Sequence, residues 1–261
     1  MKTNHIVFLD IDHTLYDAKA KKVHPSSIDA LKKLQNRGDT LIAIATGRAY
    51  YMMDVIQEVK QYIDIYITIN GQLIYQDDNI IFDDPMDKPL VAKAKALFQK
   101  HDMHYGFIGK QTQAINRFDD DAKALFDRDH LPYPIEAPDF DYDNAVYQMW
   151  AFADERRMKK LQTHFDRFEF VPWLTDGFDV IEADKTKRDG VMKVLDKLNL
   201  SKDQAICFGD GHNDIEMLAA IPRSFAMGQS PQPVKNAANY ITDAYDQDGI
   251  YNALKKLNLI D

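Results

Sequence analysis

Two pairs of acidic residues stand directly after short apolar runs of the sequence, where strands of a buried sheet would end. Asp10 and Asp12 follow one such run near the N-terminus, and Asp210 and Asp214 follow another near the C-terminus. Carboxylates gathered in one site repel one another and raise one another's pKa unless a cation offsets their charge. Magnesium accepts carboxylate oxygens together with water, whereas zinc favours histidine or cysteine at chelating spacing, which this sequence lacks. The acidic residues therefore predict a magnesium site.

A second set of residues could bind phosphate. Thr46 and Gly47 stand where an apolar run gives way to a helix-like segment, and a hydroxyl and an amide at a helix start can donate hydrogen bonds to phosphate oxygens. Taken singly, Thr46-Gly47-Arg48 indicates only a helix start. Asn70-Gly71, after a later apolar run, indicates only a hairpin turn. Beside the acidic residues, however, Thr46 and Gly47 favour a site where magnesium and a phosphate group meet.

The elements that would position these residues alternate along the first third of the chain. Apolar runs typical of buried strands alternate with segments of helical apolar spacing, which predicts βαβ units and a parallel sheet. These strands and helices are predicted, in order, at residues 6–9, 26–35, 41–45, 49–60 and 66–69. Two short alternating runs, at 73–75 and 80–82, predict a hairpin at the sheet edge. Ligands of parallel sheets lie beyond the carboxyl ends of the strands, which is where the acidic residues stand.

The middle of the chain has a different texture and predicts an inserted domain. Its helix and strand candidates are residues 90–100, 146–152, 155–165 and 178–181. The parallel pattern then returns, with candidates at residues 190–198, 205–208, 214–220, 224–227 and 240–241. We therefore predict an α/β fold whose parallel-sheet core comprises residues 1–83 and 184–261, interrupted by an inserted α+β domain at residues 84–183.

Composition limits the classes of partner. The chain has 261 residues, 45% of them hydrophobic, with 32 basic residues against 41 acidic ones and a net charge of -9. This balance gives no basic stripe for a nucleic acid, whereas a small phosphorylated metabolite is compatible with it. The apolar runs are too short for a signal peptide or a membrane span, and the single cysteine, Cys207, cannot form an internal disulfide. We expect a cytoplasmic monomer or small homo-oligomer.

The motifs also resemble a known family. They read "FLDIDHTL", "ATGR" and "FGDGHNDIEML", which are similar to the first, second and fourth motifs of the haloacid dehalogenase (HAD) superfamily. The C-terminal run "AMGQSPQPVKNAANYIT" with "DQDGI" resembles the Cof-like, class IIB sugar-phosphatase branch. The resemblance implies a Rossmann-like core, and the insertion matches the cap of that branch in position and length.

The resemblance implies a role for each acidic residue. Asp10 would be the nucleophile and a magnesium ligand, and Asp12 the general acid/base that also offers its backbone carbonyl to magnesium. Asp210 would be a metal-binding carboxylate, and Asp214 would hold the water shell of the metal. The implied activity is a phosphatase that forms an aspartyl phosphate on Asp10.

The remaining implied residues bind phosphate or substrate. Thr46, Gly47, Asn213 and Ile11 match such positions of the family, and Asn213 could also orient the nucleophile. The family lysine matches Lys187, which would bind phosphate and stabilise charge.

The lysine match departs from the family pattern. The family's Lys-Gly is here Lys187-Arg188, and Lys185 lies two residues earlier, so Lys185 stays an alternative.

Other functions use similar residues. A phosphomutase shares this core and differs only in the group that accepts the phosphoryl group. A dehalogenase needs neither a metal nor protonation by Asp12. A signalling receiver domain retains its phosphate. Two features of this chain argue against that class: Asp12 lies two residues from Asp10, where it could complete hydrolysis, and the chain carries a long insertion that a receiver domain would lack.

The inserted domain is predicted to act as a lid that excludes water and selects the organic part of the substrate. Its aromatic residues Trp150 and Trp173 are expected to form its core rather than a pocket. Its polar residues His104, Arg117 and Asp176 are candidates for specificity, although a solvated surface position is the simpler expectation for each.

Overall fold

A computed structural model describes residues 3–128, 132–174, 176–183 and 185–261, with the side chains of 173 and 174 left out. The chain divides into two compact units: unit 1 comprises Met1–Asp83 and Thr186–Asp261, and unit 2 comprises Asp84–Lys185. The second boundary thus falls after Lys185, two residues later than the pattern suggests. Within the described ranges, no helix combines the length and apolarity that a membrane span needs.

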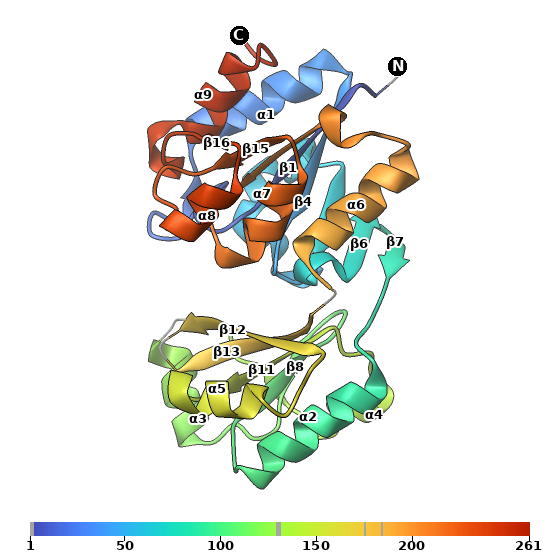
Figure 1. Ribbon diagram of the computed structural model, residues 1–261, viewed down its shortest axis with the longest axis vertical. Helices are drawn as coiled ribbons and strands as arrows, with labels where there is room; N and C mark the ends of the chain where they lie inside the picture. Colours follow the sequence, from blue (N-terminus) through green and yellow to red (C-terminus); the bar gives the residue numbers. More distant parts are fainter. Residues whose placement is uncertain (1–2, 129–131, 175, 184) are drawn as a thin grey trace. The chain divides into compact units, whose positions relative to one another are not determined.

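Unit 1 is built on one large sheet (Figure 1). In spatial order its strands are β16 (Tyr240–Ile241), β15 (Arg223–Ala226), β14 (Ala205–Gly209), β1 (His5–Leu9), β4 (Thr40–Ala45), β5 (Ile65–Thr68), β6 (Leu73–Gln76) and β7 (Asn79–Asp83). All neighbours from β16 to β5 are parallel, and β6 and β7 then add as antiparallel strands. A small hairpin, β2 (Tyr16–Asp17) with β3 (Lys22–Val23), follows β1. The predicted parallel α/β sheet is confirmed.

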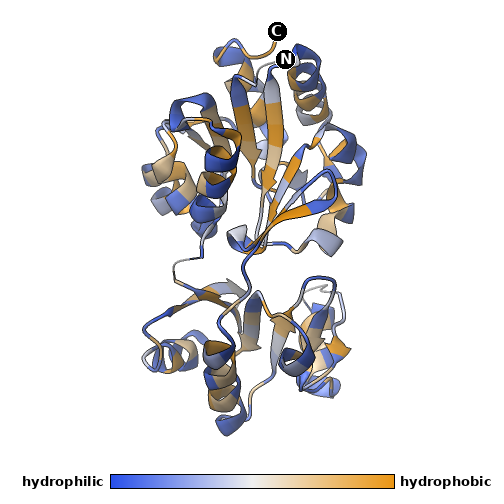
Figure 2. Cartoon of the chain, turned by 90° about the vertical axis from the view of Figure 1, so that its right-hand side faces the viewer, coloured by the Kyte–Doolittle hydropathy of each residue, from blue (hydrophilic) through white to orange (hydrophobic). Residues whose placement is uncertain are grey.

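Helices cover both faces of this sheet, and the strands between them are strongly apolar (Figure 2). The helical segments of unit 1 are α1 (Pro25–Arg37), η1 (Tyr50–Tyr62), η2 (Ile69–Gly71), α6 (Lys187–Leu198), η3 (Lys202–Gln204), η4 (His212–Asp214), α7 (Ile215–Ala220), α8 (Gln232–Ala237), η5 (Tyr245–Gln247) and α9 (Gly249–Lys256). Helix α1 packs on α9 and η1, while α7 packs between α6 and α8. Because helices bury both faces of the sheet, the sequences of β1 and β4 are continuously apolar rather than alternating between apolar and polar residues.

The structure refines or corrects three local predictions. Residues 49–60, predicted as a helix-like segment, form η1, a 3₁₀ segment with a kink at Ile56, in which the buried residues Met53, Ile56 and Val59 recur every three positions. Strand β6 lies inside the sheet because β7 covers it, so β7 rather than β6 forms the edge on this side. Helix α6 begins at Lys187 rather than at residue 190, because Asp189 accepts a hydrogen bond from the Thr186 amide and caps an earlier start.

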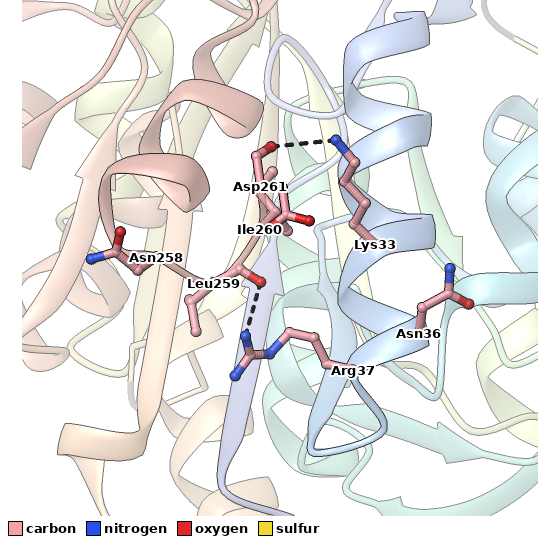
Figure 3. A pocket seen from close by; sticks show the side chains of 7 residues that line it. All are labelled: Lys33, Asn36, Arg37, Asn258, Leu259, Ile260 and Asp261. Atoms are coloured by element: carbon pink, nitrogen blue, oxygen red, sulfur yellow. Dashed lines mark hydrogen bonds between the residues drawn. The ribbon is translucent and has the colours of Figure 1, made fainter.

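The last residues of the chain pack on α1. Figure 3 shows Lys33 and Arg37 of α1 pointing toward this segment. Lys33 Nζ donates to the carbonyl of Asp261 over 3.3 Å, and an Arg37 guanidinium nitrogen donates to the carbonyl of Leu259 over 3.2 Å. These bonds fasten the chain at the amino ends of the parallel strands, remote from the ends that carry the acidic residues.

Unit 2 has its own sheet and core. Its strands in spatial order are β10 (Ile135–Glu136), β9 (Gln113–Ile115), β8 (Tyr105–Ile108), β11 (Gln148–Phe152), β13 (Gly177–Glu182) and β12 (Phe168–Leu174). Its helices are α2 (Lys88–Lys100), α3 (Asp120–Arg128), α4 (Phe140–Asp143) and α5 (Glu155–Gln162). Every described neighbour pair except β9 with β10 is antiparallel. Aromatic residues form a large part of the core. The mostly antiparallel sheet and its helices make unit 2 an α+β body.

Candidate active site

Asp10 stands at the carboxyl end of β1, the central position of the parallel sheet. Its backbone amide donates to the carbonyl of Phe208 at the end of β14, over 3.1 Å, which ties the ends of the two strands together. Its side chain is nearly enclosed, with 5% of the residue exposed. A buried carboxylate needs a charged partner, because burial without one is costly.

Lys187 supplies that partner. Its Nζ lies 2.5 Å from Asp10 Oδ1 and 2.8 Å from Asp214 Oδ1, and only 1% of the residue is exposed. The next residue, Arg188, turns away and pairs with Asp189 over 2.9 Å. The lysine expected beside the nucleophile therefore lies there as Lys187, despite the arginine that follows it.

Lys185 has a different place. Its Nζ donates to the carbonyl of Pro85 over 2.7 Å and lies 3.1 Å from Asp84 Oδ1 and 3.5 Å from Glu182 Oε2. These bonds join the beginning and the end of unit 2. The structure thus separates the two candidate lysines, and only Lys187 reaches Asp10.

A close backbone contact holds α6 where Lys187 can reach the nucleophile. Gly71 has a φ of +95°, and a Cβ there would lie 2.6 Å from the carbonyl of Thr186. A Cβ on Gly190 would lie 2.5 Å from Ile67 Cγ2 and 2.7 Å from the Cα of Gly71. Because neither glycine has a side chain, the first turn of α6 packs directly on the loop after β5.

Asp214 is fixed by the loop that follows β14. Its Oδ2 accepts hydrogen bonds from the backbone amides of Asp210, over 3.0 Å, and Gly211, over 2.9 Å. A Cβ on Gly209 would lie 2.5 Å from Asp214 Cγ, so this fold of the loop requires glycine there. Asp214 is fully buried and orients both this loop and Lys187.

Asp10, Asp210 and Asp214 form a cluster in which one oxygen of each lies within 4.8 Å of the others. Burial, followed by repulsion from Asp214, raises the pKa of Asp210 to about 6. Burial also raises the pKa of Asp10 well above its ordinary value. Repulsion from Asp214 adds to the effect of burial at both carboxyl groups. Oxygen ligands with excess negative charge suit a hard divalent cation, so the residues present fit magnesium.

The ammonium of Lys187 offsets only part of this charge. Desolvation acts to lower the pKa of Lys187, but contact with Asp10 and Asp214 outweighs it and raises that pKa, so the ammonium stays charged.

Three loops meet beside this cluster. A Cβ on Gly47 would lie 3.3 Å from Asn70 Oδ1 and 3.6 Å from Asn213 Nδ2, and Asn213 Nδ2 donates to Asn70 Oδ1 over 3.2 Å. Thr46, buried at the end of β4, accepts a hydrogen bond at Oγ1 from the Arg48 amide over 3.1 Å. The predicted phosphate ligands Thr46, Gly47 and Asn213 are thus brought together, and Asn70 joins them.

Ile11 lies differently from those residues. Its side chain is fully buried, and its carbonyl accepts hydrogen bonds from the amides of Leu15 and Tyr16. Any contact of Ile11 with a substrate would therefore have to use its backbone N–H.

Two residues of the site, Asn70 and Arg48, are not predicted as site residues from the sequence. Asn70 looked like part of a turn, and it does occupy one, with a left-handed φ of 52°, but its side chain meets Asn213. Arg48 looked like part of a helix start, but its guanidinium forms two hydrogen bonds with Asp12. The sequence signal was their position directly after β4 and β5.

The candidate residues of unit 2 make contacts within that unit. Trp150 is buried against the rings of Phe126 and Phe152, which confirms a core position, whereas the side chain of Trp173 lies outside the described residues. Arg117 pairs with Asp102, and Asp176 with Arg128, and each of these four side chains is substantially exposed. His104 is more enclosed and pairs with Asp119 over 2.8 Å.

Comparison with known proteins places this geometry in a family. A family model described as haloacid dehalogenase-like hydrolase matches residues 7–254. The "Putative bifunctional phosphatase/peptidyl-prolyl cis-trans isomerase" of Streptococcus pyogenes serotype M6 is 32% identical over 98% of this chain. The chain spans about half of that relative, 54% of its length. The "Putative phosphatase YkrA" of Bacillus subtilis is 27% identical, with 98% of each chain covered.

Solved structures agree. BT1666 from Bacteroides thetaiotaomicron, described among phosphatases of the HAD superfamily, has a TM-score of 0.91 at 27% identity, covering 99% of this chain and 96% of that one. BT4131, described as a HAD subclass IIB sugar phosphatase, has a TM-score of 0.88 at 28% identity, covering 98% and 100%. The resemblance drawn from the motifs is confirmed, and this chain belongs to the haloacid dehalogenase-like hydrolases, a family of enzymes.

Proposed function

We propose that this chain is a magnesium-dependent phosphatase that hydrolyses a small phosphorylated metabolite of the sugar-phosphate class through an aspartyl phosphate on Asp10. The observation that carries this proposal is the buried Asp10 carboxylate, held 2.5 Å from Lys187 and clustered with Asp210 and Asp214 at the end of the central strand. The likeness to the sugar phosphatase BT4131 supports the substrate class.

In the first half-reaction, an oxygen of Asp10 attacks phosphorus while the bond from phosphorus to the leaving oxygen breaks. Lys187 offsets the repulsion between the two anionic groups and stabilises negative charge on the phosphoryl oxygens in the transition state. Thr46, Gly47 and Asn213 donate hydrogen bonds to those oxygens. Asp12 donates its proton to the leaving oxygen, so that an alcohol departs rather than an alkoxide.

In the second half-reaction, Asp12 accepts a proton from water as the water oxygen attacks phosphorus. The bond between phosphorus and Asp10 breaks, inorganic phosphate leaves, and both carboxyl groups return to their starting state. One residue thus serves as acid and then as base, which makes hydrolysis rather than phosphate retention the outcome.

Magnesium would be held by Asp10, Asp210 and the backbone carbonyl of Asp12, with Asp214 holding its water shell. When bound, it supplies positive charge that neutralises the carboxylates and the substrate phosphate.

Unit 2 is the part of the chain that we assign to substrate selection. It is inserted between β7 and α6, so both of its connections join elements of unit 1, and α6 is the helix that carries Lys187. Replacing residues of unit 2 should change the preference among sugar phosphates, whereas the dependence on Asp10 should stay the same.

A screen of phosphorylated metabolites with and without magnesium tests the proposal. Phosphate release should require magnesium and should disappear in Asp10→Asn, while Asp54→Asn, an exposed aspartate in η1, serves as the matched control. Turnover that survives Asp10→Asn would overturn the mechanism. Transfer of the phosphoryl group to a second sugar, without release of phosphate, would identify a phosphomutase instead.

A further inference from the structure

The guanidinium of Arg48 holds both oxygens of the Asp12 carboxylate. Arg48 Nε lies 2.8 Å from Asp12 Oδ2, and a terminal guanidinium nitrogen lies 2.8 Å from Asp12 Oδ1. Two parallel hydrogen bonds from a planar guanidinium fix the plane of a carboxylate as well as its distance. The orientation of Asp12 is therefore set by Arg48.

The backbone of Arg48 is itself held firmly. Its amide donates to Thr46 Oγ1 over 3.1 Å, and its carbonyl accepts from the amide of Ile69 over 3.0 Å. The loop after β4 and the loop after β5 thus anchor the backbone that carries the guanidinium. About a third of each side chain is exposed, 30% for Arg48 and 40% for Asp12, so the pair lies at the surface of the site where a leaving group could reach it.

We propose that Arg48 is a positioning residue that orients the Asp12 carboxyl group for proton transfer to the leaving oxygen. The inference rests on the proposed function. Proton transfer requires one Asp12 oxygen to give up its bond to Arg48 and to face the substrate. The hydrogen bond from Arg48 to the other Asp12 oxygen remains and keeps the carboxyl group in place. The Asp12 O–H bond breaks as the leaving oxygen takes the proton and its bond to phosphorus breaks, and Asp12 regains a proton from water in the second half-reaction.

The consequence is a dependence on the leaving group. An alkyl phosphate expels a poor leaving group and needs the proton of Asp12, whereas p-nitrophenyl phosphate expels a stable anion and needs it little. The ratio kcat/KM includes every step up to departure of the leaving group, so it isolates the acid role of Asp12 from its later role as base. Loss of Arg48 should therefore lower kcat/KM selectively for alkyl phosphates.

The same unit offers a matched control. Arg37 Nε lies 3.0 Å from Asp39 Oδ1, and a second guanidinium nitrogen lies 3.2 Å from Asp39 Oδ2, with comparable exposure. Asp39 directly precedes β4, whereas Arg48 follows it, so the two pairs flank opposite ends of one strand. Arg37→Ala removes an equivalent pair far from the site.

The experiment measures kcat/KM for alkyl phosphates and p-nitrophenyl phosphate in the wild type, Arg48→Ala, Arg48→Lys, Asp12→Asn, Arg48→Ala/Asp12→Asn and Arg37→Ala. In Arg48→Ala, kcat/KM for alkyl phosphates should fall about a hundredfold, which is the effect expected of a misplaced catalytic group. For p-nitrophenyl phosphate, kcat/KM should fall at most about threefold. Arg48→Lys should lie between wild type and Arg48→Ala because it keeps the charge without the fork. The double variant should lose no more than Asp12→Asn, and Arg37→Ala should match the wild type.

The ratio between the two substrate types is independent of the fraction of folded protein, so a poorly folding variant still tests the inference. An equal loss on both substrate types, or a further loss on top of Asp12→Asn, would show that Arg48 contacts the substrate or supports the fold, and would overturn the inference. A wild type that hydrolyses neither substrate type would overturn the proposed function itself, whereas an active wild type with an unchanged ratio in Arg48→Ala overturns only the role of Arg48.

Discussion

Each unit of the chain buries a lysine between two aspartates, and the surroundings of the two lysines differ. In unit 2, Lys95 of α2 lies 2.8 Å from Asp141 and 3.1 Å from Asp139, both of which belong to the start of α4. The ring of Tyr142 covers the ammonium at 4.5 Å. Asp139 remains 69% exposed, so water shares its charge. These ion pairs join two helices, and the excess of one negative charge is shared with water rather than buried.

In unit 1, Lys187 lies between Asp10 and Asp214, which are almost fully buried, and Asp210 adds a third carboxylate to the cluster. The charges do not balance, and the cluster lies at the ends of parallel strands rather than between two helices. A lysine with two aspartates is therefore a structural ion pair in one unit and a candidate reaction centre in the other. The excess of buried carboxylates at strand ends makes the difference.

The largest expected effect separates Asp10 from Asp141. Asp10→Asn removes the nucleophile and should lower phosphate release by at least about ten-thousand-fold. Asp141→Asn should leave kcat within about threefold, because Asp141 only supports the packing of unit 2. Steady-state kinetics on purified, folded variants measures both, and comparable losses in the two would erase the distinction between the clusters.

The two lysines provide the second test. Lys187→Met should lower kcat about a hundred- to ten-thousand-fold, because the phosphoryl charge loses its counter-charge. Lys95→Met should lower the free energy of unfolding by about 1–3 kcal/mol, less than for a fully buried pair because Asp139 is exposed, and should leave kcat nearly unchanged. Denaturant titration and kinetics on each variant decide the matter. A catalytic loss in Lys95→Met like that in Lys187→Met would contradict the assignment.

Magnesium should distinguish the units through stability. At about a hundred times its dissociation constant, magnesium should stabilise unit 1 by about 2.7 kcal/mol. Both tryptophans, Trp150 and Trp173, belong to unit 2 by sequence, so tryptophan fluorescence reports the unfolding of that unit. The magnesium-induced rise in unfolding temperature should be larger when it is measured by calorimetry, which detects both units, than when it is measured by tryptophan fluorescence, which detects unit 2. The shift should vanish in Asp210→Asn, and its persistence there would place the metal elsewhere.

The smallest expected effect concerns the contact that positions Lys187. Gly190→Ala adds a Cβ 2.5 Å from Ile67 Cγ2 and should lower the free energy of unfolding by about 1–3 kcal/mol through overpacking. Lys197→Ala, at an exposed position of the same helix, is the control and should change it by less than about 0.5 kcal/mol. Equal stability of the two variants would mean that α6 adjusts freely against the loop after β5.

The predictable part of the site came from residues that stand at strand ends. Asp10 and Asp210 follow short but unbroken apolar runs, and buried parallel strands bring such ends together whatever the details of packing. The start of α6 was missed because Thr186 and Asp189 cap it before the apolar pattern begins. A helix cap depends on only two side chains, so it contributes little to the apolar periodicity from which helices are predicted.

Pairings between distant loops could not be predicted. Arg48 meets Asp12, and Asn213 meets Asn70, across separations of 36 and 143 residues. Each partner is an ordinary turn or helix-start residue by itself, and only the order of the strands in space joins them. The choice of Lys187 over Lys185 has the same origin, because it depends on contacts between distant segments: the first turn of α6, which carries Lys187, packs on the loop after β5, whereas Lys185 bonds to Pro85.

The most direct test of the account is to trap the phosphorylated enzyme. Wild type and Asp12→Asn would be mixed with magnesium and p-nitrophenyl phosphate, whose leaving group needs little protonation. The mixtures would then be quenched in acid, digested, and mapped by mass spectrometry. The account predicts one phosphoryl group on the peptide that contains Asp10, in larger amount in Asp12→Asn because the base for the second half-reaction is missing. Phosphate release with the phosphoryl group on another residue, or with none on Asp10 in either protein, would contradict it.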